Sequence, residues 1–157
     1  MATGILQQTW SYENWANDFL LKTLSQYGDK VPASTLRLLS HLFNAQFNWF
    51  NRMAGEKKQI GLWDEYDLET CKQMYLETSQ GIQDILDKHA ADPLVIIEYA
   101  NSRGMVFQNT LTDILIQLTH HGAYHRGQIA MDLRQHGQEP ILTDYIAYLR
   151  VKALNPG

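Results

Sequence analysis

The chain has 157 residues, of which 45% are hydrophobic and 19% are charged. This length is typical of one domain, and the balance supplies enough apolar side chains for a core, which argues against a disordered or fibrous protein. Seventeen acidic and thirteen basic residues give a net charge of −4. A protein that binds the phosphates of nucleic acids needs a basic face, so nucleic acid is not an expected partner.

Neither export nor membrane insertion is expected from the sequence. Cys71 is the single cysteine, so no disulfide can form within the chain. The first residues lack the basic and apolar regions of a secretory signal, and no stretch reaches the ~18 consecutive apolar residues of a membrane span. We therefore expect a cytoplasmic protein without a membrane partner, with residues 1–157 forming a single domain.

Four long segments show helical periodicity, and two of them precede Gly55. The first covers about residues 5–26, and Gly28 and Pro32 interrupt the pattern after it. Its apolar stripe consists of Leu6, Trp10, Leu21 and Leu24. The second covers about residues 33–53, with His41 at the edge of a narrow apolar arc. This arc consists of Leu38, Leu42, Ala45 and Trp49.

The third predicted helix begins after Asp67, a good N-cap residue, and runs to about residue 89. Its inward-facing positions recur at alternating steps of three and four, the spacing of a bundle seam. They are Leu68, Cys71, Tyr75, Thr78, Ile82, Ile85 and His89. After this helix, residues 94–99 are rich in strand formers, residues 101–104 are turn-like, and residues 105–108 can pair back, which predicts a short hairpin.

The fourth predicted helix begins at Thr110, whose spacing to Asp113 matches a capping box, and it ends at His136 and Gly137. Pro140 separates it from a short last helix at about residues 143–152. Together the elements predict an all-α protein. We expect an up-and-down four-helix bundle with a short β-hairpin-like insertion between the third and fourth helices and a short C-terminal helix.

The fourth helix carries two histidines within its expected buried stripe. The stripe runs through Ile114 and Leu118 to residues 121, 125 and 128, so His121 and His125 take its central positions. Side chains at i and i+4 stack on one helical face, close enough for both imidazoles to bind one metal ion. Hydrogen-bonded core histidines without metal are the alternative, although burying two neighbouring imidazoles without good partners costs several kcal/mol.

His41 is the best candidate for a third ligand, because it lies beside the apolar arc of the second helix. Residues 31–55 contain no Asp or Glu, and the fourth helix holds only Asp113 and Asp132. Three imidazoles therefore make a simpler site than a mixture with carboxylates, while an interfacial histidine without metal is the alternative for His41. Three protein ligands leave an open coordination position, as in catalytic sites, and imidazole suits Zn, Ni, Fe and Cu.

The remaining histidines and the cysteine have ordinary structural interpretations. His120 lies off the buried stripe, so we expect it at the surface or behind the ligands. His89 and His136 lie at helix ends, where the helix dipole favours a cation. Cys71 lies on the seam of the third helix and is expected to be a small core residue rather than a reactive thiol.

Two groups of side chains have roles that the sequence leaves open. Arg126 and Gln128 flank the second candidate ligand, and they either brace the helix or bind a substrate carboxylate. Asn14, Asn17 and Asn48 reach a metal-bound ligand only if the helices are rotated suitably, which periodicity does not determine.

Several short segments resemble one known family. Residues 121–128 read HGAYHRGQ, which resembles the C-terminal signature of the DinB/YfiT-like metalloenzyme family. Residues 38–42 read LLSHL with Trp49 downstream, which is similar to that family's second helix, the carrier of its first metal histidine. Residues 14–17, NWAN, and residues 143–144, TD, also fit. The resemblance therefore extends over nearly the whole chain.

The resemblance implies a four-helix bundle, a homodimer and a divalent metal ion held by His41, His121 and His125, with zinc or nickel preferred and iron as a further option. Some members of the family are S-transferases or isomerases that use a low-molecular-weight thiol. The leading hypothesis is thus a metal-dependent enzyme in which a thiol cosubstrate attacks a small electrophilic substrate. A hydrolase that uses a metal-activated water and a non-enzymatic metal- or ligand-binding stress protein are the alternatives.

Overall fold

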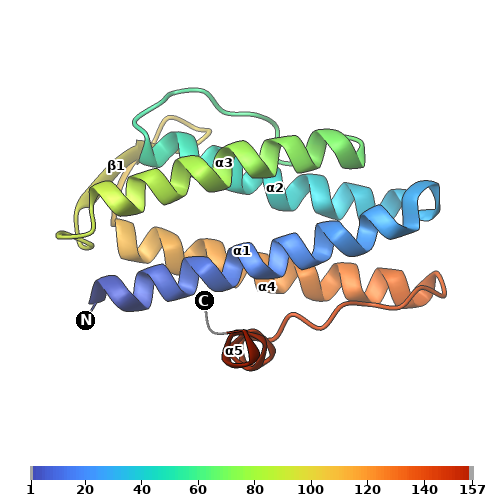
Figure 1. The fold of residues 1–157 in the computed structure, drawn as a ribbon. Coiled ribbons are helices and arrows are strands. Elements are labelled where there is room, and N and C mark those ends of the chain that lie inside the picture. Colours follow the sequence, from blue (N-terminus) through green and yellow to red (C-terminus); the bar gives the residue numbers. More distant parts are fainter. Residues whose placement is uncertain (1, 156–157) are drawn as a thin grey trace.

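The computed structural model describes residues 2–155 and contains a bundle of four long helices (Figure 1). The elements in chain order are α1 (Ala2–Tyr27), a short 3-10 helix η1 (Gly28–Lys30), α2 (Ala33–Met53), α3 (Leu68–Lys88), β1 (Ile96–Ala100), β2 (Val106–Thr110), α4 (Leu111–Gln135) and α5 (Tyr145–Leu154). The expected all-α bundle, its hairpin insertion and its short last helix are confirmed.

The helix ends follow the expected capping chemistry. The Asp67 side chain accepts a hydrogen bond from the Thr70 backbone N–H at 2.8 Å at the start of α3. At the start of α4, the Thr110 and Asp113 side chains each accept a bond from the other's backbone N–H, so the predicted capping box is present. Gly137, with φ 72°, follows the end of α4 in the left-handed conformation that glycine adopts easily.

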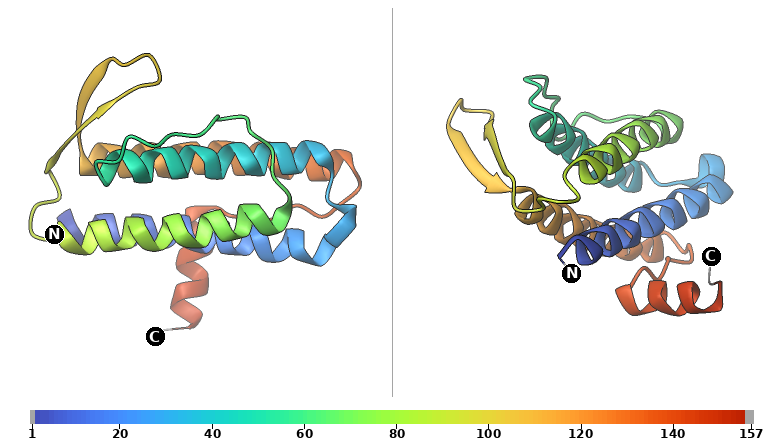
Figure 2. Two further views of the ribbon diagram at one scale, coloured as in Figure 1. Left: turned by 90° about the horizontal axis from the view of Figure 1, so that it is seen from above. Right: turned by 60° about the vertical axis from the view of Figure 1, so that its left-hand side comes forward.

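One connection departs from strict up-and-down alternation, because α2 and α3 run in the same direction (Figures 1 and 2). The side chains of Ser40 and Cys71 meet, as do those of Gln46 and Thr78, with nearly constant sequence separations of 31 and 32. Residues 54–67, called the crossover segment below, return along the bundle to allow this. Extended chain of that length reaches about 46 Å, more than the roughly 31 Å of a 21-residue helix such as α2.

Two apolar clusters fill the interior, one toward each end of the bundle. The first contains Leu20, Leu21, Leu24, Leu39, Leu42, Phe43, Cys71, Tyr75, Ile129 and Leu133. The second contains Leu6, Trp10, Met53, Ile82, Leu86, Leu111, Ile114, Leu115 and Leu118. Between them along the helices lie buried polar side chains: Glu13, Asn17, Gln46, Thr78 and Arg126. The expected seam of α3 is confirmed from Cys71 to Ile82 and then continues through Leu86. Leu68, Ile85 and His89 are half-buried.

An ion pair between α1 and α4 lies at the centre of this polar layer. Arg126 and Glu13 are 1% and 2% exposed, and two guanidinium nitrogens donate to the two carboxylate oxygens at 2.7 and 2.9 Å. Asn17 accepts a further bond from Arg126 at 2.8 Å. A Cβ at Gly122 would overlap with the Glu13 carboxylate, so glycine is required for this close approach. Burial lowers the pKa of Arg126, but the charge and hydrogen bonds of Glu13 together with the effect of Tyr12 outweigh it, so the pKa is raised overall.

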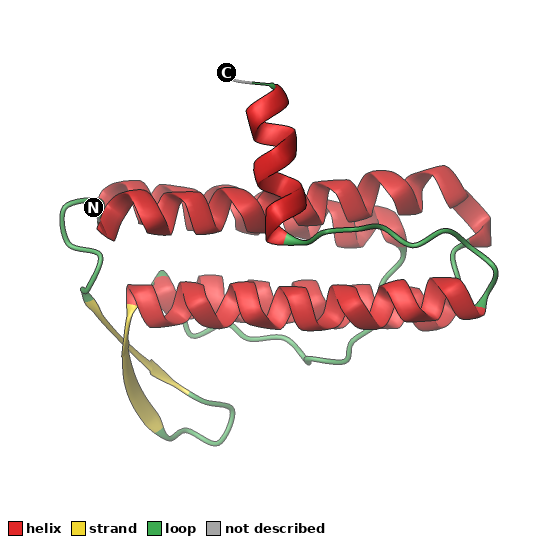
Figure 3. Ribbon diagram, turned by 90° about the horizontal axis from the view of Figure 1, so that it is seen from below, coloured by secondary structure: helices red, strands yellow, loops and turns green. Residues whose placement is uncertain are grey.

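The β1–β2 hairpin and α5 attach at different sides of the bundle. The hairpin pairs β1 and β2 antiparallel, with Ile96 opposite Thr110 and Ala100 opposite Val106, and it projects beyond the helices (Figure 2). Helix α5 crosses beside α1 and α4 and extends away from them (Figure 3). Its buried residue, Tyr148, packs its ring 5.9 Å from that of Tyr12. Within residues 2–155, none of the helices combines the length and the apolar character that crossing a membrane requires.

The buried ion pair predicts a large effect for the substitution Glu13→Gln. It leaves the Arg126 charge buried without its counter-ion, and removing one partner of a buried pair typically costs about 3–5 kcal/mol. We expect a loss of that size in the free energy of unfolding, measured by urea denaturation.

The matched control is Glu65→Gln. Glu65 pairs with Arg37 at 3.6 Å, but both side chains are 60% exposed. Such pairs contribute about 0–1 kcal/mol. Equal losses in the two variants would contradict a central role for the buried pair.

Candidate metal centre

The structure brings together three histidines from two helices. His41 comes from α2, and His121 and His125 come from successive turns of α4. Each offers one ring nitrogen to a common space, and these nitrogens lie within 4.8 Å of one another. The ring centroid of His41 lies 5.3 Å from that of His121 and 4.5 Å from that of His125. The donor set that the sequence suggested is thus assembled in one place.

Hydrogen bonds orient two of the three rings. The Nδ1 atom of His41 lies 2.9 Å from the carbonyl oxygen of Leu62, and the Nδ1 atom of His125 lies 2.7 Å from Oε1 of Gln128. Because a carbonyl oxygen can only accept, each Nδ1 carries the hydrogen, which leaves the Nε2 lone pair free. Outer partners of this kind typically fix the tautomer and the orientation of metal-binding histidines.

The surroundings keep the histidines of α4 uncharged. Burial lowers the pKa of His121 to about 4, and the nearby His125 and His41 add to the shift. Burial also lowers the pKa of His125, against the opposing effect of its bond to Gln128. At neutral pH both imidazoles are therefore in the form that binds a metal ion.

Aromatic side chains surround the histidines on the solvent side. The Trp63 ring, from the crossover segment, stacks on His41 with centroids 3.9 Å apart and planes 13° apart. The Tyr124 ring meets His125 edge-on at 5.0 Å. Trp63 and Tyr124 are 50% and 65% exposed, and His121 is half-buried. The cluster therefore lies close to the surface, with apolar rings beside it.

Polar side chains of α2 hold the crossover segment against the site. Asn44 donates to the carbonyl oxygens of Leu62 and Asp64 at 3.3 and 2.8 Å. Asn48 donates to the carbonyl of Ile60 and accepts from its N–H at 3.0 and 2.9 Å. His41, Asn44 and Asn48 are spaced at three and four residues, so one face of α2 binds the backbone of the segment.

Of the two α4 histidines, His125 is buried as the periodicity predicts, whereas His121 lies at the border of the buried face. The buried face of α4 includes Gly122, His125, Arg126 and Ile129. His121 and Gln128, which the predicted stripe also contained, are half-buried. The reason is the ion pair of Arg126 with Glu13, which turns a charged residue toward α1. On α2, His41 is buried.

The arginine, glutamine and asparagine side chains whose roles the sequence leaves undecided each make hydrogen bonds within the protein. Arg126 braces α4 against α1, and Gln128 orients His125. Asn17 donates to Glu13 and accepts from Arg126. The Asn14 backbone and side chain accept from the hydroxyl of Tyr75, and Asn48 binds the crossover segment.

The remaining histidines and the cysteine lie where the sequence predicted. His120 is exposed, and His89 and His136 cap the ends of α3 and α4. Cys71 is fully buried, with its Sγ 3.5 Å from Oγ of Ser40. Burial raises the pKa of its thiol. Cys71 is therefore a core residue and not an activated nucleophile.

Sequence reasoning missed Trp63 and the Leu62 carbonyl. Both belong to the crossover segment, which has no periodicity from which a position could be inferred. The available signal was the presence of two adjacent large apolar residues, Leu62 and Trp63, in a segment that is mostly polar.

Comparison with known proteins gives two findings. The sequence profile of the DinB family matches residues 7–156. The Protein DinB of Bacillus subtilis (strain 168) is 24% identical to this chain over 158 residues, which cover 89% of this chain and 91% of that protein.

The lowered pKa of His121 predicts an acid-sensitive metal-free protein. An imidazole of the unfolded chain takes up a proton near pH 6.5, whereas folded His121 does so only near pH 4. Between these values the unfolded state binds more protons, so the free energy of unfolding falls as the pH is lowered. We expect the urea midpoint of chelator-treated protein to decrease over this window.

The comparison that isolates His121 uses two variants. His121→Gln, which has nothing to protonate, should show a shallower decrease, while His120→Gln on the exposed face should behave as the parent. An unchanged profile for His121→Gln would show that other groups cause the decrease.

Proposed function

The chain belongs to the DinB family, and on that premise we propose that His41, His121 and His125 bind a divalent metal ion in a metal-dependent enzyme. The observation that carries this proposal is the convergence of three ring nitrogens within 4.8 Å. Two nitrogens bound to one ion at about 2.1 Å each are at most about 4.2 Å apart. Small side-chain movements are therefore enough to form the site.

The donor chemistry supports zinc or nickel, with iron as a further option. All three donors are imidazoles, which suit borderline ions of this kind better than magnesium or calcium. The carbonyl of Leu62 and the amide of Gln128 supply the outer hydrogen bonds that such sites require. When bound, the ion supplies a Lewis acid with an open coordination position, at which the pKa of a thiol or water is lowered.

For the reaction, we propose transfer of a low-molecular-weight thiol to a small electrophile. The chain's own thiol is excluded, because Cys71 is buried in the core with a raised pKa. A cosubstrate must therefore supply the sulfur. In the transfer, the sulfur forms a bond to an electrophilic carbon, the thiol proton passes to solvent, and the leaving group departs with its electron pair. The exposed rings of Trp63 and Tyr124 provide apolar walls for such a substrate.

We also propose that the chain forms a homodimer through α5 and the adjoining face of α1. The exposed apolar side chains of α5 include Ile146, Val151 and Leu154. Phe19 on α1 is 41% exposed, and its ring is tilted against that of Trp15 with centroids 5.9 Å apart. Sedimentation velocity should give twice the monomer mass, and Ile146→Glu should shift the protein to the monomer. A monomeric parent protein would contradict this arrangement.

Metal content tests the site directly. We expect about one equivalent of metal per chain, measured by mass spectrometry on untagged protein, and loss of that metal in His41→Ala, His121→Ala and His125→Ala. His120→Ala removes an exposed histidine next to the site and should retain the metal. The proposal would be refuted if the three single variants fold and keep the metal. It would also be refuted if the parent protein binds no metal after reconstitution.

Thiol dependence tests the reaction. We expect the metal-loaded protein to conjugate bacillithiol, glutathione or cysteine to members of an electrophile panel, and His121→Ala to lose this activity. Turnover without added thiol would indicate a hydrolase instead. Metal binding without turnover of any combination of thiol and electrophile would favour a non-enzymatic binding protein.

A further inference from the structure

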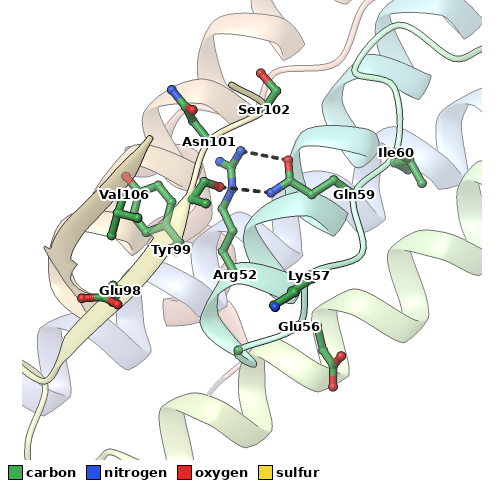
Figure 4. A pocket seen from close by; sticks show the side chains of 12 residues that line it. Arg52, Glu56, Lys57, Gln59, Ile60, Glu98, Tyr99, Asn101, Ser102 and Val106 are labelled. Atoms are coloured by element: carbon green, nitrogen blue, oxygen red, sulfur yellow. Dashed lines mark hydrogen bonds between the residues drawn. The ribbon is translucent and has the colours of Figure 1, made fainter. Parts of the chain in front are cut away.

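A pocket lies between the end of α2 and the hairpin, and none of the three histidines lines it (Figure 4). Its volume is about 640 Å³, which is within the range of pockets for small organic molecules. Arg52 and the beginning of the crossover segment form one wall, and the hairpin from Glu98 to Ser102, with Val106, forms the other.

The guanidinium group of Arg52 is held at the centre of this pocket. It lies 4.6 Å from the ring centroid of Trp49 and 5.3 Å from that of Tyr99. Its Nη2 donates to Oε1 of Gln59 at 3.3 Å, and Gln59 in turn donates to the carbonyl of Ala100 at 3.4 Å. The two rings also contact each other edge-on, with centroids 5.0 Å apart. These contacts fix the guanidinium in one position against the pair of aromatic rings.

This guanidinium lacks a counter-ion among the residues that the structure describes. Arg37 and Arg126, by contrast, are paired with Glu65 and Glu13. Gln59 is its one hydrogen-bond acceptor within residues 2–155, although a guanidinium carries five N–H donors, and its Nε is buried without a partner. Burial lowers the pKa of Arg52, against the effect of Tyr99, so the charge is partly desolvated and uncompensated.

The carboxylates that line the pocket do not compensate this charge. Glu98 accepts a bond from Gln108 across the hairpin at 2.9 Å, and Figure 4 shows both Glu98 and Glu56 pointing away from the guanidinium. Lys57 supplies a second cation on the same wall. The chemistry that fits the free donors of Arg52 is an oxoanion, because the guanidinium fork matches the oxygens of a carboxylate or phosphate.

We propose that this pocket binds a small organic molecule through its carboxylate or phosphate group, with Arg52 as the anion-binding residue. The site is separate from the candidate metal centre. Arg52 follows His41 by eleven positions on α2, or roughly 16 Å along the helix. The proposal therefore does not depend on the proposed function and can be tested on metal-free protein.

Nuclear magnetic resonance of the metal-free, full-length protein provides the test. The probes are succinate, citrate, inorganic phosphate and phenyl phosphate, which separate carboxylate from phosphate recognition. We expect saturable shifts of the Arg52 Nε–H and Trp49 indole N–H signals with at least one probe. The neutral diamide of succinate should produce no such shifts.

Variants assign the effect to Arg52. Arg52→Gln should weaken binding by about tenfold or more, as loss of a charge-assisted contact does, while Arg134→Gln, an exposed arginine of α4, should bind as the parent. Arg52→Lys keeps the charge without the fork and should bind at intermediate strength. No saturable shift with any probe, equal shifts with the neutral diamide, or unchanged affinity in Arg52→Gln would overturn the proposal. The diamide comparison uses the parent protein and is decisive even if the variants fail to fold.

Discussion

The buried ion pair between Arg126 and Glu13 sets the rotation of α4, and the geometry of the candidate metal centre depends on that rotation. Successive residues of a helix are about 100° apart. With Arg126 directed at α1, the preceding residue, His125, is turned to the side that faces α2. His121, one turn earlier, has nearly the same direction. Gly122 permits the close approach, because any larger residue would overlap with Glu13.

The same geometry gives the two α4 histidines different surroundings. His125 is buried, whereas His121 lies at the border of the buried face and is half-buried. Burial lowers the pKa of both imidazoles, so both are uncharged at neutral pH. The exposed rings of Trp63 and Tyr124 contact His41 and His125, so the cluster lies close to the surface.

Much of the fold and of the histidine cluster could be predicted from the sequence, because local rules govern them. Capping residues such as Asp67 and Thr110 act within one helical turn, and the spacing of His121 and His125 is a property of a single helix. The direction of α3 relative to α2 depends instead on a long, aperiodic connection. The place of Trp63 depends on the same connection, and the buried face of α4 depends on a partner over a hundred residues away, Glu13. Pairwise contacts at such distances leave no periodic trace in one sequence.

The way in which α2 holds the crossover segment has an evolutionary consequence. His41, Asn44 and Asn48 bind main-chain atoms of residues 60, 62 and 64, so the path of the segment is specified without reference to its side chains. Substitutions at Trp63 can therefore alter the surroundings of His41 while the segment keeps its course. Variation beside the cluster and preservation of the three histidines are thereby assigned to different stretches of the gene.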